Sequence, residues 1–248
     1  DNTLTCIEVN EEDIAWATEN WTYENGNIDE GVEFSVVCVP EGYTYVPDNN
    51  FEQALVDLGY DSAVDDFVLT ENISGVTNLD VSEKEISDLT GIEDFTALWF
   101  LDCGDNELTS LYVSSLTVLD EIRCSENELT SLDVSANTAL RTLWCRDNQL
   151  TSLDVSANTA LYYLQCYNNQ LTSLDVNGAT SLEILWCHGN QLTSLDVSSN
   201  TALTHLDCHS NQLTTLDVSA NTALEWMYFN NNQLIHLNMK NGVTDQSE

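Results

Sequence analysis

Residues 140–160 read LRTLWCRDNQLTSLDVSANTA, and residues 161–181 read LYYLQCYNNQLTSLDVNGATS. The two stretches match position by position, and further units of the same 21-residue length begin at Leu182, Leu203 and Leu224. Looser units begin at Leu98 and Leu119, and a degenerate one begins with the apolar residues of 76–81. A fixed period of this length indicates a solenoid in which each unit adds one coil.

The apolar spacing within each unit predicts strands. Every unit contains L-x-x-L-x-C-x-x-N-x-L, and a second copy of the same spacing is nested inside it, as in Leu150, Leu153 and Val155. Alternation in L-x-C and L-x-V has the period of a strand rather than a helix. The expected fold is therefore mainly β, a solenoid of about 7–8 coils over residues 76–241 with two parallel sheets.

Stacked coils would place equivalent side chains about 4.8 Å apart, in continuous ladders. We expect an interior ladder of cysteines that remain free thiols: Cys103, Cys124, Cys145, Cys166, Cys187 and Cys208. A ladder of asparagines would bond backbone groups that the turns leave unpaired. Its members are Asn106, Asn127, Asn148, Asn169, Asn190, Asn211 and Asn232.

The nested repeat resembles the short 21-residue leucine-rich repeats, the IRREKO type, of Bacteroidetes-like bacterial surface proteins. Residues 46–55 and 89–95 resemble the segment that leads into such arrays, and residues 4–9 resemble the segment that follows a preceding array. The resemblance covers nearly the whole chain. It implies a leucine-rich-repeat fold in an exported protein and, by analogy, a role in adhesion or protein binding.

Residues 46–75 are predicted to form an N-terminal cap with one short helix. Asp48 is suited to begin that helix, and Phe51, Ala54, Leu55 and Leu58 would form its apolar stripe before Gly59. A cap of this kind keeps water from the end of an open solenoid.

Residues 1–45 are expected to be a separate segment of short strands, tied by a disulfide between Cys6 and Cys38. The alternative is that these are two unrelated buried thiols. A disulfide implies an oxidising compartment, so we expect a secreted or cell-surface location. Residues 242–248 would be a tail, and the chain is expected to belong to a longer protein of several domains.

The composition restricts the possible partners. The chain carries 42 acidic and 5 basic residues, for a formal net charge of -37. Such a surface repels nucleic acid and anionic membranes, and no apolar run reaches the length of about 18 residues that direct membrane insertion needs. The remaining candidates are a protein or a polysaccharide ligand. The sequence also lacks the short motifs of catalytic sites, so no enzymatic activity is expected.

The outward positions of the first strand vary from coil to coil, whereas those of the second strand are nearly constant. Exposed aromatic side chains at this density are unusual and suit an extended ligand. The alternatives are cross-strand packing alone and a rigid spacer without a ligand. The candidate ligand-binding residues are Arg123, Trp144, Arg146, Tyr163, Tyr167, Trp186, His188, His205, His209, Trp226 and Tyr228.

Two groups are weaker candidates for metal ions. Ca²⁺ could bridge an outward row of aspartates, although turn hydrogen bonds are the favoured explanation for this row: Asp133, Asp154, Asp175, Asp196 and Asp217. His188, Asp207 and His209 could bind Zn²⁺, with surface histidines in an aromatic patch as the favoured alternative. No other cofactor is expected.

Overall fold

The computed structural model describes residues 4–26 and 28–242, and the predicted tail at 242–248 lies outside them except for Gly242. The chain divides into two compact units, Asp1–Thr44 and Tyr45–Glu248. The first contains β1 (Cys6–Glu8), a 3-10 turn η1 (Glu11–Asp13), α1 (Ile14–Asn20) and β2 (Glu33–Ser35), with β1 and β2 paired in parallel. The strands were predicted from the sequence. Helix α1 was not, because its seven residues show too short an apolar pattern.

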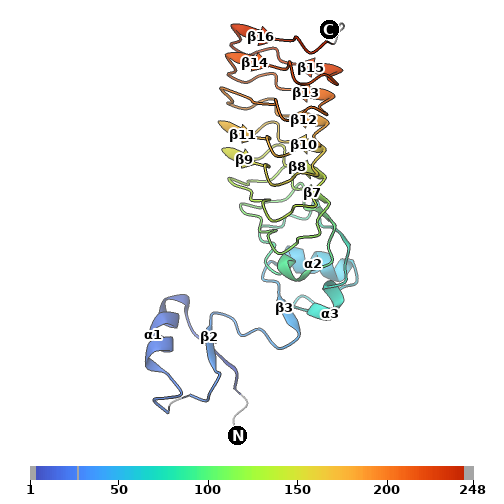
Figure 1. Ribbon diagram of the computed structural model, residues 1–248. Helices are drawn as coiled ribbons and strands as arrows, with labels where there is room; N and C mark the ends of the chain where they lie inside the picture. Colours follow the sequence, from blue (N-terminus) through green and yellow to red (C-terminus); the bar gives the residue numbers. More distant parts are fainter. Residues whose placement is uncertain (1–3, 27, 243–248) are drawn as a thin grey trace. The chain divides into compact units, whose positions relative to one another are not determined.

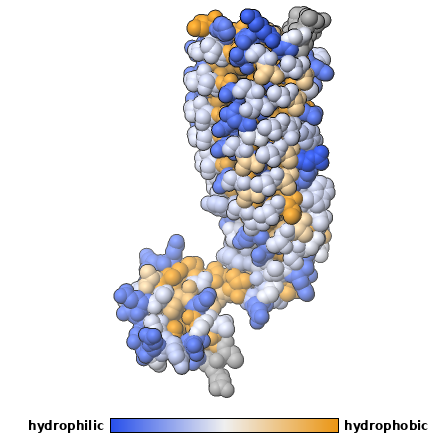
Figure 2. Space-filling view, in the orientation of Figure 1, coloured by the Kyte–Doolittle hydropathy of each residue, from blue (hydrophilic) through white to orange (hydrophobic). Residues whose placement is uncertain are grey.

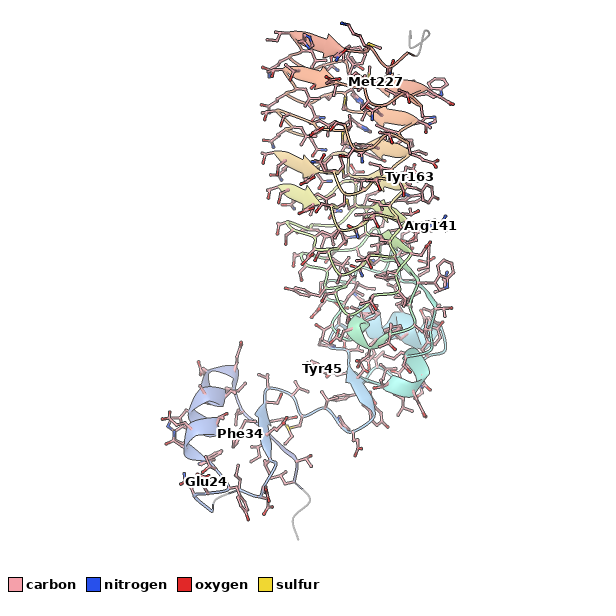
Figure 3. The ribbon with its side chains drawn as sticks, in the orientation of Figure 1. Glu24, Phe34, Tyr45, Arg141, Tyr163 and Met227 are labelled. Carbon is pink, nitrogen blue, oxygen red and sulfur yellow. A yellow bond between two sulfur atoms is a disulfide. The ribbon has the colours of Figure 1, made fainter. Side chains whose placement is uncertain are left out.

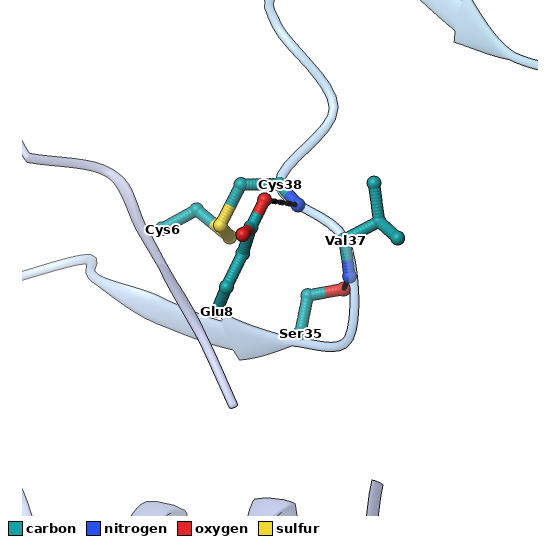
Figure 4. Close-up of a disulfide and its surroundings, with 5 residues drawn as sticks. All are labelled: Cys6, Glu8, Ser35, Val37 and Cys38. Atoms are coloured by element: carbon teal, nitrogen blue, oxygen red, sulfur yellow. Dashed lines mark hydrogen bonds between the residues drawn. A yellow bond between two sulfur atoms is a disulfide. The ribbon is translucent and has the colours of Figure 1, made fainter. Parts of the chain in front are cut away.

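The predicted disulfide holds the first unit together (Figure 4). Cys6 and Cys38 are bonded, with their Cα atoms 5.7 Å apart. The Glu8 carboxylate accepts a hydrogen bond of 3.1 Å from the backbone N–H of Cys38. The ring of Trp21 lies 5.8 Å from that of Phe34 on β2. The disulfide and a few aromatic contacts therefore replace a large core in this unit.

The cap consists of β3 (Tyr43–Tyr45), α2 (Asn49–Asp57), β4 (Phe67–Leu69) and α3 (Thr70–Ile73), and β3 pairs with β4. Helix α2 is the predicted one, and α3 is a second, four-residue helix. The Asp48 Oδ1 atom accepts hydrogen bonds from the N–H groups of Asn50 and Phe51, as expected of a residue that begins a helix. Its Oδ2 atom accepts hydrogen bonds from the N–H groups of Ser87 and Asp88, which join the cap to the first coil.

The predicted apolar stripe of α2 is correct except at its last position. Phe51, Ala54 and Leu55 are buried in the core, whereas Leu58 is 46% exposed. Leu58 follows the last residue of α2 and is already in the turn at Gly59, so it points away from the buried face. No helix in the described residues is long and apolar enough to cross a membrane.

One side of the coils forms a continuous parallel sheet of eight strands (Figure 1). Each strand pairs in register with its neighbours, so Leu164 lies opposite Leu143 and Leu185. In chain order the strands are β5 (Asn78–Asp80), β6 (Phe100–Asp102), β7 (Glu121–Arg123), β8 (Thr142–Trp144), β10 (Tyr163–Gln165), β12 (Ile184–Trp186), β13 (His205–Asp207) and β15 (Trp226–Tyr228). We call this the first sheet.

The opposite side of the coils is less regular. Within the described residues, β9 (Ser152–Asp154) pairs with β11 (Ser173–Asp175), and β14 (Thr215–Asp217) pairs with β16 (His236–Asn238). The second predicted sheet is therefore present as two separate pairs. A 3-10 turn, η2 (Ile92–Asp94), precedes the first regular coils. The architecture is the predicted mainly β solenoid.

The predicted interior ladders are present. All six repeat cysteines are free and buried. The Asn148 side chain accepts a hydrogen bond from the N–H of Leu129 and donates to the carbonyls of Cys124 and Cys145, and its equivalents repeat this pattern. Figure 2 shows that side chains near the middle of the hydropathy scale cover most of the visible solenoid surface, with separate hydrophilic patches and narrow apolar stripes among them.

A second asparagine ladder was not predicted. Asn137, Asn158, Asn200 and Asn221 are fully buried, and each donates to two backbone carbonyls of the preceding coil. Ala179 interrupts this ladder. The two ladders fix opposite turns of the coil, so the outward side chains between them are held at regular spacing.

Candidate functional site

The candidate site is the outward surface of the first sheet. In each coil it comprises the residues on either side of the inward Leu and the residue after the Cys position; we call this surface the aromatic face. Side chains on alternate positions of a strand point to the same side of the sheet. Figure 3 shows Tyr163 on this side of the solenoid. All the candidate ligand-binding residues lie on this face, so the register predicted from the sequence is confirmed.

The middle of the aromatic face is a row of rings in contact. The ring of Tyr163 lies 6.0 Å from that of Trp144 and 5.6 Å from that of Trp186, both edge to face. Gln165, which shares a strand with Tyr163, is buried among these side chains. Edge-to-face pairs at this distance stabilise a sheet. Cross-strand packing therefore accounts for part of this pattern.

A second row lies over the residues that follow the cysteines. Arg146 pairs with Asp147 at 2.8 Å and with Glu126, and these hydrogen bonds raise the pKa of its guanidinium against the opposing effect of burial. Its Cζ atom lies 5.8 Å from the centre of the Tyr167 ring. The Tyr167 ring stacks on His188 at 4.4 Å, and His188 stacks on His209 at 4.5 Å.

Arg123 occupies a complete cation site within the face. Its Cζ atom lies 5.1 Å from the centre of the Phe100 ring and 4.2 Å from that of Trp144. Its Nε atom is 2.6 Å from a carboxylate oxygen of Glu121, and its Nη1 atom is 3.6 Å from Asp102. The neighbouring strands supply two rings and the Asp102 carboxylate to this guanidinium, and its own strand supplies the Glu121 carboxylate, an arrangement that favours a cation.

Towards the C-terminal end the face contains a hollow of about 140 Å³. Asp207 lies between Trp186 on β12 and Tyr228 on β15 in the strand register. The ring of Trp226 stacks on His205 at 6.3 Å. Trp226 is 53% exposed and Tyr228 is 47% exposed. The residues lining the hollow are Trp186, His205, Leu206, Asp207, Trp226 and Tyr228.

The Asp207 carboxylate also contacts two imidazoles. Its Oδ1 atom is 2.6 Å from Nδ1 of His209, and its Oδ2 atom is 3.3 Å from Nδ1 of His188. Burial lowers the pKa of His188, which outweighs the opposite effect of Asp207. The potential ligand atoms of the three residues lie within 4.8 Å of one another, so the structure brings the candidate zinc ligands together.

The aspartates on the other side of the coils form turns. In each coil the Asp Oδ1 atom accepts a hydrogen bond from the backbone N–H two residues further on, as between Asp154 and Ser156 at 2.8 Å. Hydrogen bonds from the Ser156 side chain and backbone lower the pKa of Asp154, although it is nearly fully exposed. These turns are the favoured explanation for the row. Among the described residues the groups with three close metal-ligand atoms are His188–Asp207–His209 and Glu52–Asp61–Asp65, and they do not include this row.

An additional row borders the aromatic face and was missed by the sequence analysis. Trp99 is 44% exposed and Tyr162 is 36% exposed, and both directly follow the first Leu of their units. Arg141 holds the same position, on the same side of the solenoid as Tyr163 (Figure 3), and its Cζ atom lies 5.5 Å from the centre of the Tyr162 ring. The sequence contained a signal for this row, since the position directly after the first Leu of each unit varies and includes both aromatic and charged residues.

The repeats match a known family. The sequence profile of the family described as Leucine Rich repeats (2 copies) matches residues 138–178 and 180–221. The solenoid has the leucine-rich-repeat fold. A search of the curated proteins found no match.

Several solved leucine-rich-repeat structures resemble this domain. Internalin C2 of Listeria monocytogenes is 23% identical, with a TM-score of 0.69, and the match covers 80% of this chain and 92% of that chain. An internalin, InlF, of the same organism is 23% identical, with a TM-score of 0.58 and coverage of 78% and 69%. These likenesses establish the fold.

The functional domain of InlJ from Listeria monocytogenes, described as including a cysteine ladder, is 32% identical, with a TM-score of 0.49. That match covers 80% of this chain and 54% of the InlJ chain, so this chain spans about half the length of that solved domain.

Proposed function

We propose that this leucine-rich-repeat domain is a non-enzymatic recognition or adhesion module that binds a protein or a glycan through the aromatic face. The observation that carries the proposal is the exposure of Trp226 and Tyr228, which keep about half of their surfaces in water beside a hollow. Both residues lie on β15, the edge strand of the first sheet, so a ligand can reach them from the hollow and from the edge. Large rigid rings with polar groups around them are typical of binding surfaces.

The proposal includes the origin and location of the protein. The disulfide between Cys6 and Cys38 supports a secreted or cell-surface protein, because such bonds persist in oxidising compartments. The nested 21-residue units support membership of the IRREKO type of Bacteroidetes-like surface proteins. The chain would be one part of a longer protein.

A rigid spacer without a ligand is the second candidate. The contacts of Tyr163 with Trp144 and Trp186 favour it, because they tie neighbouring coils together. The two functions can be separated, since the central rings have structural contacts while Trp226 and Tyr228 lie at the exposed end of the face.

The test compares variants on the two sides of the coils. A glycan array and a pull-down of secreted and surface proteins would identify a ligand for the unmodified domain. The Trp144→Ala/Trp186→Ala/Trp226→Ala variant should lose that ligand, and Trp226→Ala alone should weaken it with an unchanged melting temperature. Tyr112→Ala is the matched control, because Tyr112 is 78% exposed between Leu111 and Val113 of the opposite side. Loss of stability without any ligand for the unmodified domain would favour the spacer.

A further inference from the structure

The aromatic face already shows how it holds a guanidinium. Arg123 on β7 lies between a ring from β6 and a ring from β8, at 5.1 Å from Phe100 and 4.2 Å from Trp144. The sum of these two distances is close to the separation of alternate strands, which is about 9.6 Å. Glu121, on the same strand, and Asp102, on the strand before, complete the site with carboxylates. A planar cation therefore fits between alternate strands of this sheet.

Two rings and a carboxylate also meet around Asp207, which occupies in its own strand the position that Arg123 has in β7. Trp186 and Tyr228 come from the two strands that flank β13, and Asp207 lies between them in the register. The five basic residues of the chain are at positions 84, 123, 141, 146 and 240, so none belongs to β12, β13 or β15. The rings and the carboxylate are present. The side chains that contact this carboxylate are the imidazoles of His188 and His209, and no lysine or arginine comes from these three strands.

We propose that the hollow around Asp207 binds the guanidinium of an arginine side chain carried by a partner protein. This inference rests on the proposed function and deepens it, because it names the partner chemistry of the same face. A carboxylate between two aromatic rings attracts a cation by charge and by the ring faces together. The formal net charge of -37 also favours a basic partner over a neutral glycan or an acidic surface.

The size and access of the hollow agree with such a ligand. Its volume of about 140 Å³ equals that of several water molecules, each of which takes about 30 Å³ in the liquid. Trp226 and Tyr228 are about half exposed, so the entrance is open. His188 and His209 contact the Asp207 carboxylate, which has about four acceptor positions and retains capacity for the ligand.

The first experiment uses the unmodified chain and two peptides, acetyl-Gly-Arg-Gly-amide and its citrulline counterpart, which has the same shape without the charge. NMR spectra of the tryptophan indole N–H groups report binding. The arginine peptide should shift the signals of Trp186 and Trp226 and leave Trp99 unchanged, and added salt should weaken the effect. Equal shifts with the citrulline peptide, or shifts at Trp99 alone, would overturn the inference.

The second experiment uses variants. Asp207→Asn should weaken binding of the arginine peptide by at least about tenfold, because the charge that pairs with the guanidinium is lost. Asp217→Asn is the matched control: it lies in the same coil, on the opposite side, and removes the same charge. Peptide affinity unchanged by Asp207→Asn would also overturn the inference. A protein or glycan ligand that depends on Trp226 but not on Asp207 would leave the proposed function standing.

Discussion

The side-chain oxygen of Asn148 accepts a hydrogen bond of 2.9 Å from the backbone N–H of Leu129, one coil earlier in the chain. The side-chain nitrogen of Asn148 donates to the carbonyl of Cys124, also at 2.9 Å. One buried amide therefore satisfies a donor and an acceptor of the preceding coil, which no water could reach. Every complete coil repeats this arrangement.

Replacing this amide should be costly. Asn148→Ala would leave the N–H of Leu129 without a partner inside the protein, at about 1–3 kcal/mol for a buried group, and would leave the carbonyl of Cys124 with only the Asn127 side chain as donor. We expect a loss of about 1–4 kcal/mol in the free energy of unfolding, measured by urea denaturation. Gln149→Ala is the control, because Gln149 is the exposed neighbour. Similar losses in the two variants would show that the amide is not the cause.

The second asparagine ladder is interrupted at Ala179, and the residue before it, Gly178, gives another prediction. A Cβ atom placed on Gly178 would lie 1.7 Å from the carbonyl oxygen of Ser156, so the backbones are too close for any side chain. Gly178→Ala should destabilise the domain by about 1–3 kcal/mol, as overpacking does in other cores. Ala157 is the equivalent residue of the preceding unit and carries its Cβ, so Ala157→Gly should cost only about 1 kcal/mol or less. A fully stable Gly178→Ala variant would show that this turn moves freely.

The sequence predicted the solenoid because the 21-residue period can be read from the repeats alone, without knowledge of tertiary contacts. Once Leu143 and Cys145 are assigned to the interior, Trp144 must point outward, and the observed register agrees. The sequence did not predict the contacts of Arg123 or the hollow at Asp207, because these depend on side-chain conformations across three strands. Helix α1 was missed because tertiary contacts, rather than a strong local pattern, stabilise a segment of seven residues.

The thiols of the cysteine ladder should be unreactive in the folded protein. Burial raises the pKa of Cys166 to about 12 and that of Cys145 well above its ordinary value. Thiols react as thiolates, so the native domain should show no reaction with Ellman's reagent near neutral pH. All six free thiols should react after unfolding in guanidinium chloride. Rapid reaction of the native protein would show that the coils open locally.

Metal binding at the histidines should be weak. The rings of His188 and His209 stack within 13° of parallel, whereas an imidazole nitrogen binds a metal ion in the plane of its own ring. Both rings would have to rotate, and His188 would lose its stacking on Tyr167. We expect that excess Zn²⁺ leaves the melting temperature unchanged, and that Ca²⁺ likewise has no effect through the aspartate row. A rise in melting temperature with Zn²⁺ that His209→Ala abolishes would instead establish the site.

Acid should weaken the domain partly through His188. Burial lowers the pKa of His188 below its ordinary value of 6.5, so the unfolded chain binds more protons than the folded one between these two values. Stability then rises with pH through this interval, is complete above about 6.5, and is lost as the pH falls below it. His188→Gln should flatten the dependence of the free energy of unfolding on pH in this range. His236→Gln, which changes an exposed histidine of β16, should leave it as in the unmodified domain. An unchanged slope in His188→Gln would show that other groups cause the acid sensitivity.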